Sequence, residues 1–359
     1  MRTIDLQLPL LQAEDGSVLT AKKSVLHFSA DRFARDICDG DCCFICGASP
    51  KDVKFNREHV LPDWIIRKYG LHKQTITLPN GQQHQYGTYK TPCCVECNSL
   101  LSEVYEQPLS KVLSSGHDAV VSYVRNGGAQ TLFTWLALIF LKTHLKDTSL
   151  RLHLREDAGK QSIAADYAWR DFHHLHCLAR SAYTGAHIES EAFGSLMVVP
   201  TKIEPEMIPF DLIDLSVAQT LVLRMDDFAL CATFNDGCAV NIGLQSLLGK
   251  IRGALNWIQT RELAAQFACC NLHLKNRPTF HTRLDFSSRP YVFIGAQHDE
   301  VPSFEDKDPE LFGALMEQVV LSTEADLRID GYSPKEVHRS VRAGEVTFLL
   351  DSSGNFLST

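Results

Sequence analysis

Two Cys-x-x-Cys pairs constrain this chain more than any other feature of its sequence. Cys43 and Cys46 form the first pair, and Cys94 and Cys97 form the second. Each pair fits a knuckle, a tight turn that presents two sulfur atoms to one tetrahedral Zn²⁺ ion. Forty-seven residues separate Cys46 from Cys94, whereas common zinc fingers have roughly 12 to 20 residues between their pairs. The spacing therefore predicts a structural zinc site with a functional unit inserted between its two halves.

Two further cysteines leave open which four of the six neighbouring cysteines bind the zinc ion. Cys42 and Cys93 directly precede the two pairs, but only 43/46 and 94/97 give the two-residue spacing twice. The N-terminus lacks the apolar core and cleavage site of a secretory signal, so we expect a cytoplasmic protein. In that reducing compartment the twelve cysteines should be thiols or metal ligands rather than disulfides. Buried thiols with a chance spacing are the alternative, which the repeated spacing disfavours.

Composition indicates a globular protein without a membrane span. Of the 359 residues, 45% are hydrophobic and 22% are charged. The longest apolar run, residues 132–141, is shorter than the roughly 18 to 20 residues of a membrane span, so we expect a buried helix there and no membrane partner. The net charge is −8, but residues 43–111 carry a local +2. A positive segment on an acidic body permits nucleic-acid binding without demonstrating it.

Three side chains in and beside the bracketed segment have the chemistry of a hydrolytic site. Glu58-His59 joins a carboxylate to an imidazole that exchanges a proton near neutral pH. Asn98 follows the last cysteine and adds an amide oxygen from the first turn of a helix that we expect from Val95. Oxygen ligands of this kind suit Mg²⁺ or Mn²⁺. A histidine beside such an ion could activate water for attack on a phosphodiester.

Together these residues resemble the HNH endonucleases, in the zinc-knuckle subgroup of the ββα-metal superfamily. The resemblance spans about 65 residues and rests on Cys43-x-x-Cys46, Arg57-Glu58-His59-Val60-Leu61-Pro62-x-Trp64 and Cys94-x-x-Cys97-Asn98. It implies that His59 is the general base and that Glu58 and Asn98 bind a catalytic Mg²⁺ or Mn²⁺. It also implies that Cys43, Cys46, Cys94 and Cys97 bind a structural Zn²⁺. Tyr105-Glu106 stands where members of the group often end a short helix in Leu-Glu.

Some positions of the motif leave alternatives open. The middle residue of the family motif, commonly an asparagine that orients the histidine, has no clear counterpart, and His84, Asn80 and Tyr89 are the candidates. His84 and Glu106 could support the metal site from behind its ligands, and Glu106 could instead form a salt bridge. Asn98 could also cap its helix without binding a metal.

Other constellations carry less functional weight. The tract His173-His174-Leu175-His176-Cys177 resembles a metal-binding run but has no second cluster to complete it, and Cys269-Cys270 and Trp64 are expected in the core. Basic side chains around the motif could contact phosphates, although a solvated basic face explains them nearly as well. These side chains are Arg57, Arg67, Lys68 and Lys73.

The sequence predicts an α+β protein, with a ββα-metal HNH module on four-cysteine zinc knuckles embedded in a larger mixed α+β body. Residues 1–41 should form a β-hairpin segment that turns at Asp15-Gly16, and residues 42–115 the nuclease module. Residues 116–359 should form a mixed α+β C-terminal domain of unknown role. Helical patterns within it cover 118–146 and 244–272, and strand patterns cover 195–199, 220–224, 228–234 and 291–294.

The sequence therefore predicts a metal-dependent endonuclease that hydrolyses DNA, with RNA as an alternative substrate. The competing hypothesis is a zinc-stabilised nucleic-acid-binding module without catalysis, which the unfilled middle position favours. In a third reading the C-terminal body senses a signal or docks a partner, either a second copy of the chain or a regulatory protein. Such an architecture is common among bacterial defence nucleases that resemble this chain, so an antiviral role is conceivable.

Overall fold

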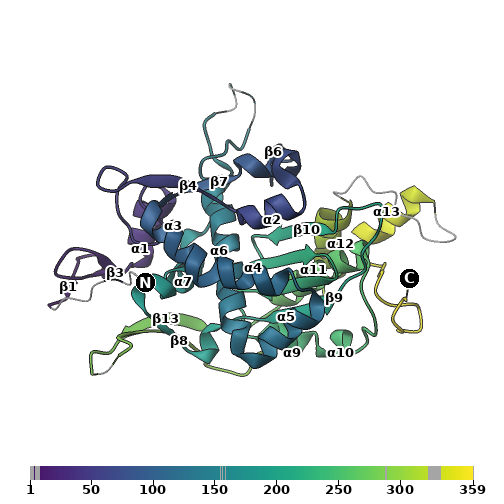
Figure 1. The fold of residues 1–359 in the computed structure, drawn as a ribbon. Helices are drawn as coiled ribbons and strands as arrows, with labels where there is room; N and C mark the ends of the chain where they lie inside the picture. Colours follow the sequence, from purple (N-terminus) through teal and green to yellow (C-terminus); the bar gives the residue numbers. More distant parts are fainter. Residues whose placement is uncertain are drawn as a thin grey trace. The chain divides into compact units, whose positions relative to one another are not determined.

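The computed structural model describes residues 4, 9–153, 155, 157, 159–287, 289–321 and 333–358 (Figure 1). Helices and several sheets together confirm the mixed α+β class. The chain forms two compact units: unit 1 contains residues 1–111, 130–192 and 280–295, and unit 2 contains residues 112–129, 193–279 and 296–359. The sequence predicted domain boundaries after residues 41 and 115, so that each predicted domain was one continuous segment. Each of the two units instead combines three separated stretches of sequence. Among the described residues, no helix combines the length and apolar character that a membrane span needs.

Unit 1 begins with a small antiparallel sheet in the order β1-β2-β3. Its strands are β1 (Leu11–Gln12), β2 (Val18–Leu19) and β3 (Val25–His27). Leu11 lies opposite Leu19, and Gly16 turns the chain with a φ of +84°, a conformation that glycine adopts without strain. The hairpin predicted at Asp15-Gly16 is confirmed, while residues 1–3 and 5–8 of that segment lie outside the described residues.

A two-stranded ribbon followed directly by a helix carries the motif residues. Strand β4 (Phe55–His59) pairs antiparallel with β7 (Lys90–Cys94), and helix α3 (Val95–Leu101) begins at the next residue. Phe55 lies opposite Cys94 and His59 lies opposite Lys90, so the ribbon runs from the cysteine pairs at one end to His59 at the other.

The segment between the two ribbon strands folds as a helix and a hairpin. Helix α2 (Asp63–Lys68) follows Pro62, and β5 (Thr75–Thr77) pairs with β6 (Gln83–Gln85). Asn80-Gly81, a dipeptide typical of turns, joins these two strands, with Gly81 at a φ of +80°.

Helix α3 continues through a π-helical turn at 102–106 into α4 (Gln107–Leu113). Pro108 lies at the second position of α4, where a continuous α-helix would kink, because proline lacks an amide hydrogen and its ring collides with the carbonyl four residues earlier. The wider π turn accommodates it, since the amide of Gln107 bonds the carbonyl of Ser102 five residues back.

Helix α6 (Ala129–Asp147) is the buried helix predicted from the apolar run at 132–141. Every residue from Leu132 to Leu145 is buried, including Lys142 and His144. The preceding helix α5 (His117–Tyr123) completes the helical stretch predicted for 118–146. A charged side chain on so apolar a helix requires buried partners of opposite charge.

The histidine tract lies on helix α7 (His173–Ala179) and is structural. The Nε2 atoms of His173, His174 and His176 lie 2.8, 2.9 and 2.8 Å from the carbonyl oxygens of Phe28, Ala192 and Phe44. Because a carbonyl only accepts, each of these nitrogens carries the proton and donates it. No metal-ligand group that includes these histidines occurs in the described part of the chain.

The remaining elements of unit 1 are short. They are helices α1 (Ala30–Phe33) and α8 (Ser181–Thr184) and a sheet in the order β13-β14-β8, from β8 (His187–Ile188), β13 (Thr279–Leu284) and β14 (Val292–Gln297). Strand β14 confirms the strand predicted at 291–294.

Unit 2 is built on a four-stranded antiparallel sheet in the order β10-β11-β12-β9. The strands are β9 (Leu196–Pro200), β10 (Phe210–Leu215), β11 (Thr220–Met225) and β12 (Phe228–Thr233). Besides α5, its α-helices are α9 (Ala239–Gly243), α10 (Gln245–Leu248), α11 (Trp257–Leu272), α12 (Pro309–Met316) and α13 (Pro334–Arg342). Helix α11 packs on the sheet and buries Cys269 as predicted, whereas Cys270, also predicted in the core, is only partly buried against it.

Two sequence patterns of unit 2 proved incomplete. Strand β10 was missed because aspartates interrupt its apolar residues; one of them, Asp211, is paired in the fold with Arg261 at 2.8 Å. The helical pattern at 244–272 divides into α10 and α11, which begins at the capping box of Asn256 and Gln259.

Acid should destabilise unit 1 because it buries neutral histidines. Burial lowers the pKa of His144 from 6.5 and lowers the pKa of His174 from 6.5 to about 3. Below pH 6.5 the unfolded chain therefore binds protons that the folded chain excludes. The stabilisation is complete above that pH and should fall by about 1.4 kcal/mol per pH unit for each histidine as the pH drops towards the folded pKa. Urea unfolding at pH 7.5 and 5.5 measures this loss.

A His174→Gln variant isolates one histidine, since glutamine can still donate to the Ala192 carbonyl. Its stability should fall less between pH 7.5 and 5.5 than that of the wild type. His153→Gln, at an exposed position, should leave the pH dependence unchanged. An equal pH dependence in His174→Gln and the wild type would contradict the assignment.

Candidate metal centre and active site

The four cysteines of the two pairs converge in unit 1. Their sulfur atoms all lie within 4.8 Å of one another, and Cys46 Sγ lies 3.7 Å from Cys94 Sγ. Zn–S bonds of about 2.3 Å in a tetrahedron place the sulfurs about 3.8 Å apart, so the group fits one zinc ion. The predicted register is confirmed, because Cys42 and Cys93 are not members of this group, although Cys93 Sγ lies 3.9 Å from Cys43 Sγ.

The local backbone prepares this four-sulfur cluster. The amide of Cys94 donates to Cys43 Sγ at 3.5 Å, and the amide of Cys97 donates to Cys94 Sγ at 3.4 Å, so Cys94 also caps helix α3. Gly47 closes the first knuckle with a φ of +77° and donates its N–H to the Cys43 carbonyl at 2.8 Å. A Cβ on Gly47 would lie 2.6 Å from the ring of Phe28, so both space and conformation select glycine.

The sulfurs shift one another's pKa values. Interaction with Cys43, together with burial, raises the pKa of Cys46 and of Cys97. Interaction with the neighbouring cysteines lowers the pKa of Cys43. A cation bound by all four sulfurs must therefore displace protons, and zinc affinity should rise with pH.

A buried arginine lies next to the four-sulfur cluster. Arg180 is 3% exposed, and its guanidinium donates to the carbonyls of Ile45 at 2.6 Å, Leu26 at 3.1 Å and Val25. It also interacts electrostatically with Cys46 and Cys97. Because four thiolates and one Zn²⁺ carry a net charge of about −2, a guanidinium beside them reduces the cost of burying that charge. Sequence reasoning missed Arg180, since no spacing relates it to the cysteines.

Glu58 is buried and faces a lysine from a distant part of the chain. Glu58 lies on strand β4 and is 7% exposed. The Nζ atom of Lys142, on helix α6, donates to Glu58 Oε1 at 3.0 Å and to the His59 carbonyl oxygen at 2.9 Å. Although burial opposes it, Glu58 and Glu106 raise the pKa of Lys142. Burial and the adjacent Glu58 raise the pKa of Glu106, while Lys142 lowers it. Buried Glu58, buried Lys142 and half-buried Glu106 thus form one charge cluster, the carboxylate–lysine cluster.

His59 ends strand β4 on the opposite face from Glu58, because successive side chains of a strand alternate. It is half-buried and lies directly across the ribbon from Lys90. Burial and Lys90 lower the pKa of His59, while Asp63 of helix α2 raises it. The imidazole is therefore neutral at pH 7 and able to accept a proton.

The candidates for the middle motif residue are engaged elsewhere. Asn80 Nδ2 donates to the carbonyls of Arg151 and Leu152 at 2.9 and 3.2 Å. The ring of His84 packs edge-on against Tyr89, with centroids 5.4 Å apart. Among acidic groups, Asp63 acts most strongly on His59, and sequence reasoning missed it because it belongs to α2 rather than to the ribbon.

The other predicted site residues lie close to the ribbon. Asn98 is half-buried on the first turns of α3, and Trp64 is half-buried on α2. The predicted phosphate contacts are all exposed, and Arg67 is paired with Asp63. They are Arg57, Arg67, Lys68 and Lys73.

One of the two predicted donors of a catalytic Mg²⁺ or Mn²⁺ already has a cationic partner. The Oε1 atom of Glu58 is bonded to the Lys142 ammonium. Within the described residues, the four cysteines are the one group of three or more His, Cys, Asp or Glu side chains close enough to share an ion. Ligation of a divalent cation by Glu58 and Asn98 stays a prediction that this arrangement does not support.

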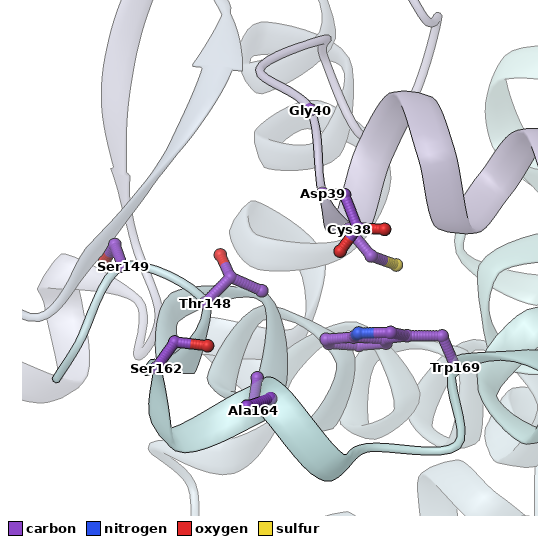
Figure 2. A pocket seen from close by; sticks show the side chains of 9 residues that line it. Cys38, Asp39, Gly40, Thr148, Ser149, Ser162, Ala164 and Trp169 are labelled. Atoms are coloured by element: carbon purple, nitrogen blue, oxygen red, sulfur yellow. The ribbon is translucent and has the colours of Figure 1, made fainter. Parts of the chain in front are cut away.

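A separate cavity of about 550 Å³ lies elsewhere in unit 1 (Figure 2). Hydroxyl groups line one part of it, the indole of Trp169 lies along another, and Cys38 and Asp39 face it. None of the motif residues lines this cavity, so it is not part of the candidate site.

Loss of one cluster cysteine should abolish zinc binding. Cys97→Ser should reduce the zinc content of the purified protein from about one ion per chain to none, because three thiolates hold a structural zinc poorly. Cys93→Ser is the matched control, since Cys93 is a buried cysteine of the adjoining strand β7 but lies outside the cluster. Elemental analysis by mass spectrometry measures the content, and equal zinc loss in both variants would refute the register.

Removing the guanidinium of Arg180 should weaken both the fold and the zinc site. Arg180→Met leaves three buried carbonyls unsatisfied, so unfolding free energy should fall by about 3 kcal/mol or more. Zinc should also transfer faster to a competing chelator, because the charge next to the thiolates is lost. Arg170→Met changes an exposed arginine that pairs with exposed Asp31, and should alter neither quantity.

Comparisons with known proteins assign no family to this chain. No protein-family model, curated protein sequence or solved structure matches it. The residues and their geometry carry the functional argument.

Proposed function

We propose that this chain is an endonuclease that hydrolyses phosphodiester bonds in DNA, with His59 as the general base. One observation carries the proposal: the half-buried imidazole of His59 ends strand β4, and the other end of the same ribbon adjoins the four-sulfur cluster. Burial and Lys90 lower the pKa of this imidazole, which favours its role as a proton acceptor. The succession of β4, β7 and α3 is the order of elements that the resemblance to HNH endonucleases implies.

The surroundings of His59 suit an anionic substrate. Arg57 lies two residues before His59 and therefore on the same face of β4, and Lys90 lies directly opposite His59. Both cations could contact the phosphates on either side of a scissile bond. Asp63 stabilises the imidazolium that forms when His59 accepts a proton from the attacking water.

Zinc in this protein is assigned a structural role. Four sulfur ligands complete the tetrahedral coordination of Zn²⁺, which leaves no position for water or substrate. The ion would fix the ends of β4 and β7 and the start of α3. A catalytic Mg²⁺ or Mn²⁺ is part of the resemblance alone, and no step is assigned to it.

The carboxylate–lysine cluster favours a second candidate, a zinc-stabilised nucleic-acid-binding module without catalysis. If Lys142 holds Glu58 permanently and no residue takes the middle position, His59 could lack the partners that catalysis needs. Such a module would bind DNA with a strong dependence on salt, because Lys and Arg side chains release counterions from the phosphates.

A plasmid assay with zinc-loaded protein separates the two candidates. The wild type, with Mg²⁺ or Mn²⁺ present, should convert supercoiled DNA to nicked or linear forms. His59→Ala should slow cleavage by at least about 100-fold, the effect expected for loss of a general base, while zinc content and DNA affinity stay unchanged. Parallel reactions with RNA define the substrate class.

His153→Ala serves as the control, because His153 is an exposed histidine outside the site. Cleavage at the wild-type rate by His59→Ala would refute the role of His59. Salt-sensitive binding by a wild type that cuts neither DNA nor RNA would favour the second candidate.

A further inference from the structure

Two carboxyl groups, that of buried Glu58 and that of half-buried Glu106, interact with one buried ammonium, that of Lys142. The side chains of Lys142 and Glu58 are 4% and 9% exposed, and Glu106 interacts electrostatically with both. Lys142 directs its ammonium at a carboxylate oxygen and a backbone carbonyl, which are two hard oxygen atoms. Oxygen donors of this type are the ones that divalent cations such as Mg²⁺ and Mn²⁺ prefer.

Burying the Lys142 ammonium destabilises the folded protein unless groups of opposite charge lie close to it. Lys142 lies within a run of α6 in which every residue from Leu132 to Leu145 is buried. Burying an ammonium costs several kcal/mol, which only close partners of opposite charge offset. The two carboxyl groups provide that compensation, so each side of the cluster requires the other.

We infer that the Lys142 ammonium occupies the cation position of the Glu58 carboxylate, in place of a divalent metal ion. Glu58 is then a positioning residue rather than a metal ligand. Through Lys142 it holds the His59 carbonyl, and with it the end of strand β4 that presents the imidazole. The inference rests on the proposed function for the role of His59, but the occupancy of the cation position can be tested without activity.

Glu58→Gln tests the wild-type cation position directly. Mn²⁺ binding to zinc-loaded protein is followed by the loss of the free-ion signal in electron paramagnetic resonance. Wild type and Glu58→Gln should show the same Mn²⁺ binding, because the carboxylate is already occupied. A Mn²⁺ site that is present in the wild type and lost in Glu58→Gln would overturn the inference.

Lys142→Met tests whether the vacated position accepts a divalent ion. This variant leaves two carboxyl groups uncompensated and should unfold at a lower temperature than the wild type. At about 100 times its Kd, Mn²⁺ should raise the unfolding midpoint of Lys142→Met by about 5 °C. It should leave the midpoints of the wild type and of the double variant Lys142→Met/Glu58→Gln unchanged.

Refolding covers the case in which Lys142→Met does not fold alone. The variant should then recover soluble, zinc-loaded protein when refolded with Mn²⁺ but not without it. If Mn²⁺ neither stabilises Lys142→Met nor restores its folding, while the double variant folds, the ammonium is not replaceable by a divalent ion and the inference is wrong.

The two proposals fail independently. A wild type that cleaves no nucleic acid but behaves as described towards Mn²⁺ refutes the proposed function and leaves the cation position assigned to Lys142. If the wild type cleaves DNA and has a Mn²⁺ site that the Glu58→Gln variant lacks, the nuclease function is supported and the inference is refuted.

Discussion

The convergence of two cysteine pairs across 47 intervening residues determines the architecture of the motif segment. Closing a loop of this length costs configurational entropy, and the local hydrogen bonds between amides and sulfurs are too weak to offset that cost alone. A zinc ion shared by all four sulfurs would provide the missing free energy. Once the sulfurs meet, β4 and β7 lie in register, α3 starts directly after its cap Cys94, and His59 lies at the far end of the ribbon.

Local sequence signals predicted the local structure well. The register of the zinc cysteines, the turns at Gly16 and Gly81, and the buried helix at 132–141 all follow from spacing, glycine conformation or apolar runs within a few residues of one another. The structural fate of the histidine tract could be anticipated too, since it lacked a second cluster. These features depend on short-range chemistry, which a single sequence contains in full.

The residues that complete the site could not be predicted in this way. Lys142 lies 84 positions from Glu58, and Arg180 lies 135 positions from Ile45. Read along the chain, Lys142 is one charge in an apolar helix, and Arg180 follows an apolar turn. Only tertiary packing shows that each neutralises a buried negative group. Asp63 was overlooked for a related reason, because its influence on His59 depends on how α2 turns back after Pro62.

Because the motif and its charge partners are far apart in sequence, the motif segment alone should not function when it is moved into another protein. Residues 42–115 contain the sulfurs, both glutamates and His59, but neither the ammonium of Lys142 nor the guanidinium of Arg180. Transplanted as a cassette, this stretch would carry buried negative charge with no counterion. Recombination that shuffles the motif between proteins would therefore have to move α6 and the helices around Arg180 together with it. The site therefore depends on residues from several parts of unit 1, and not only on the segment that contains the motif.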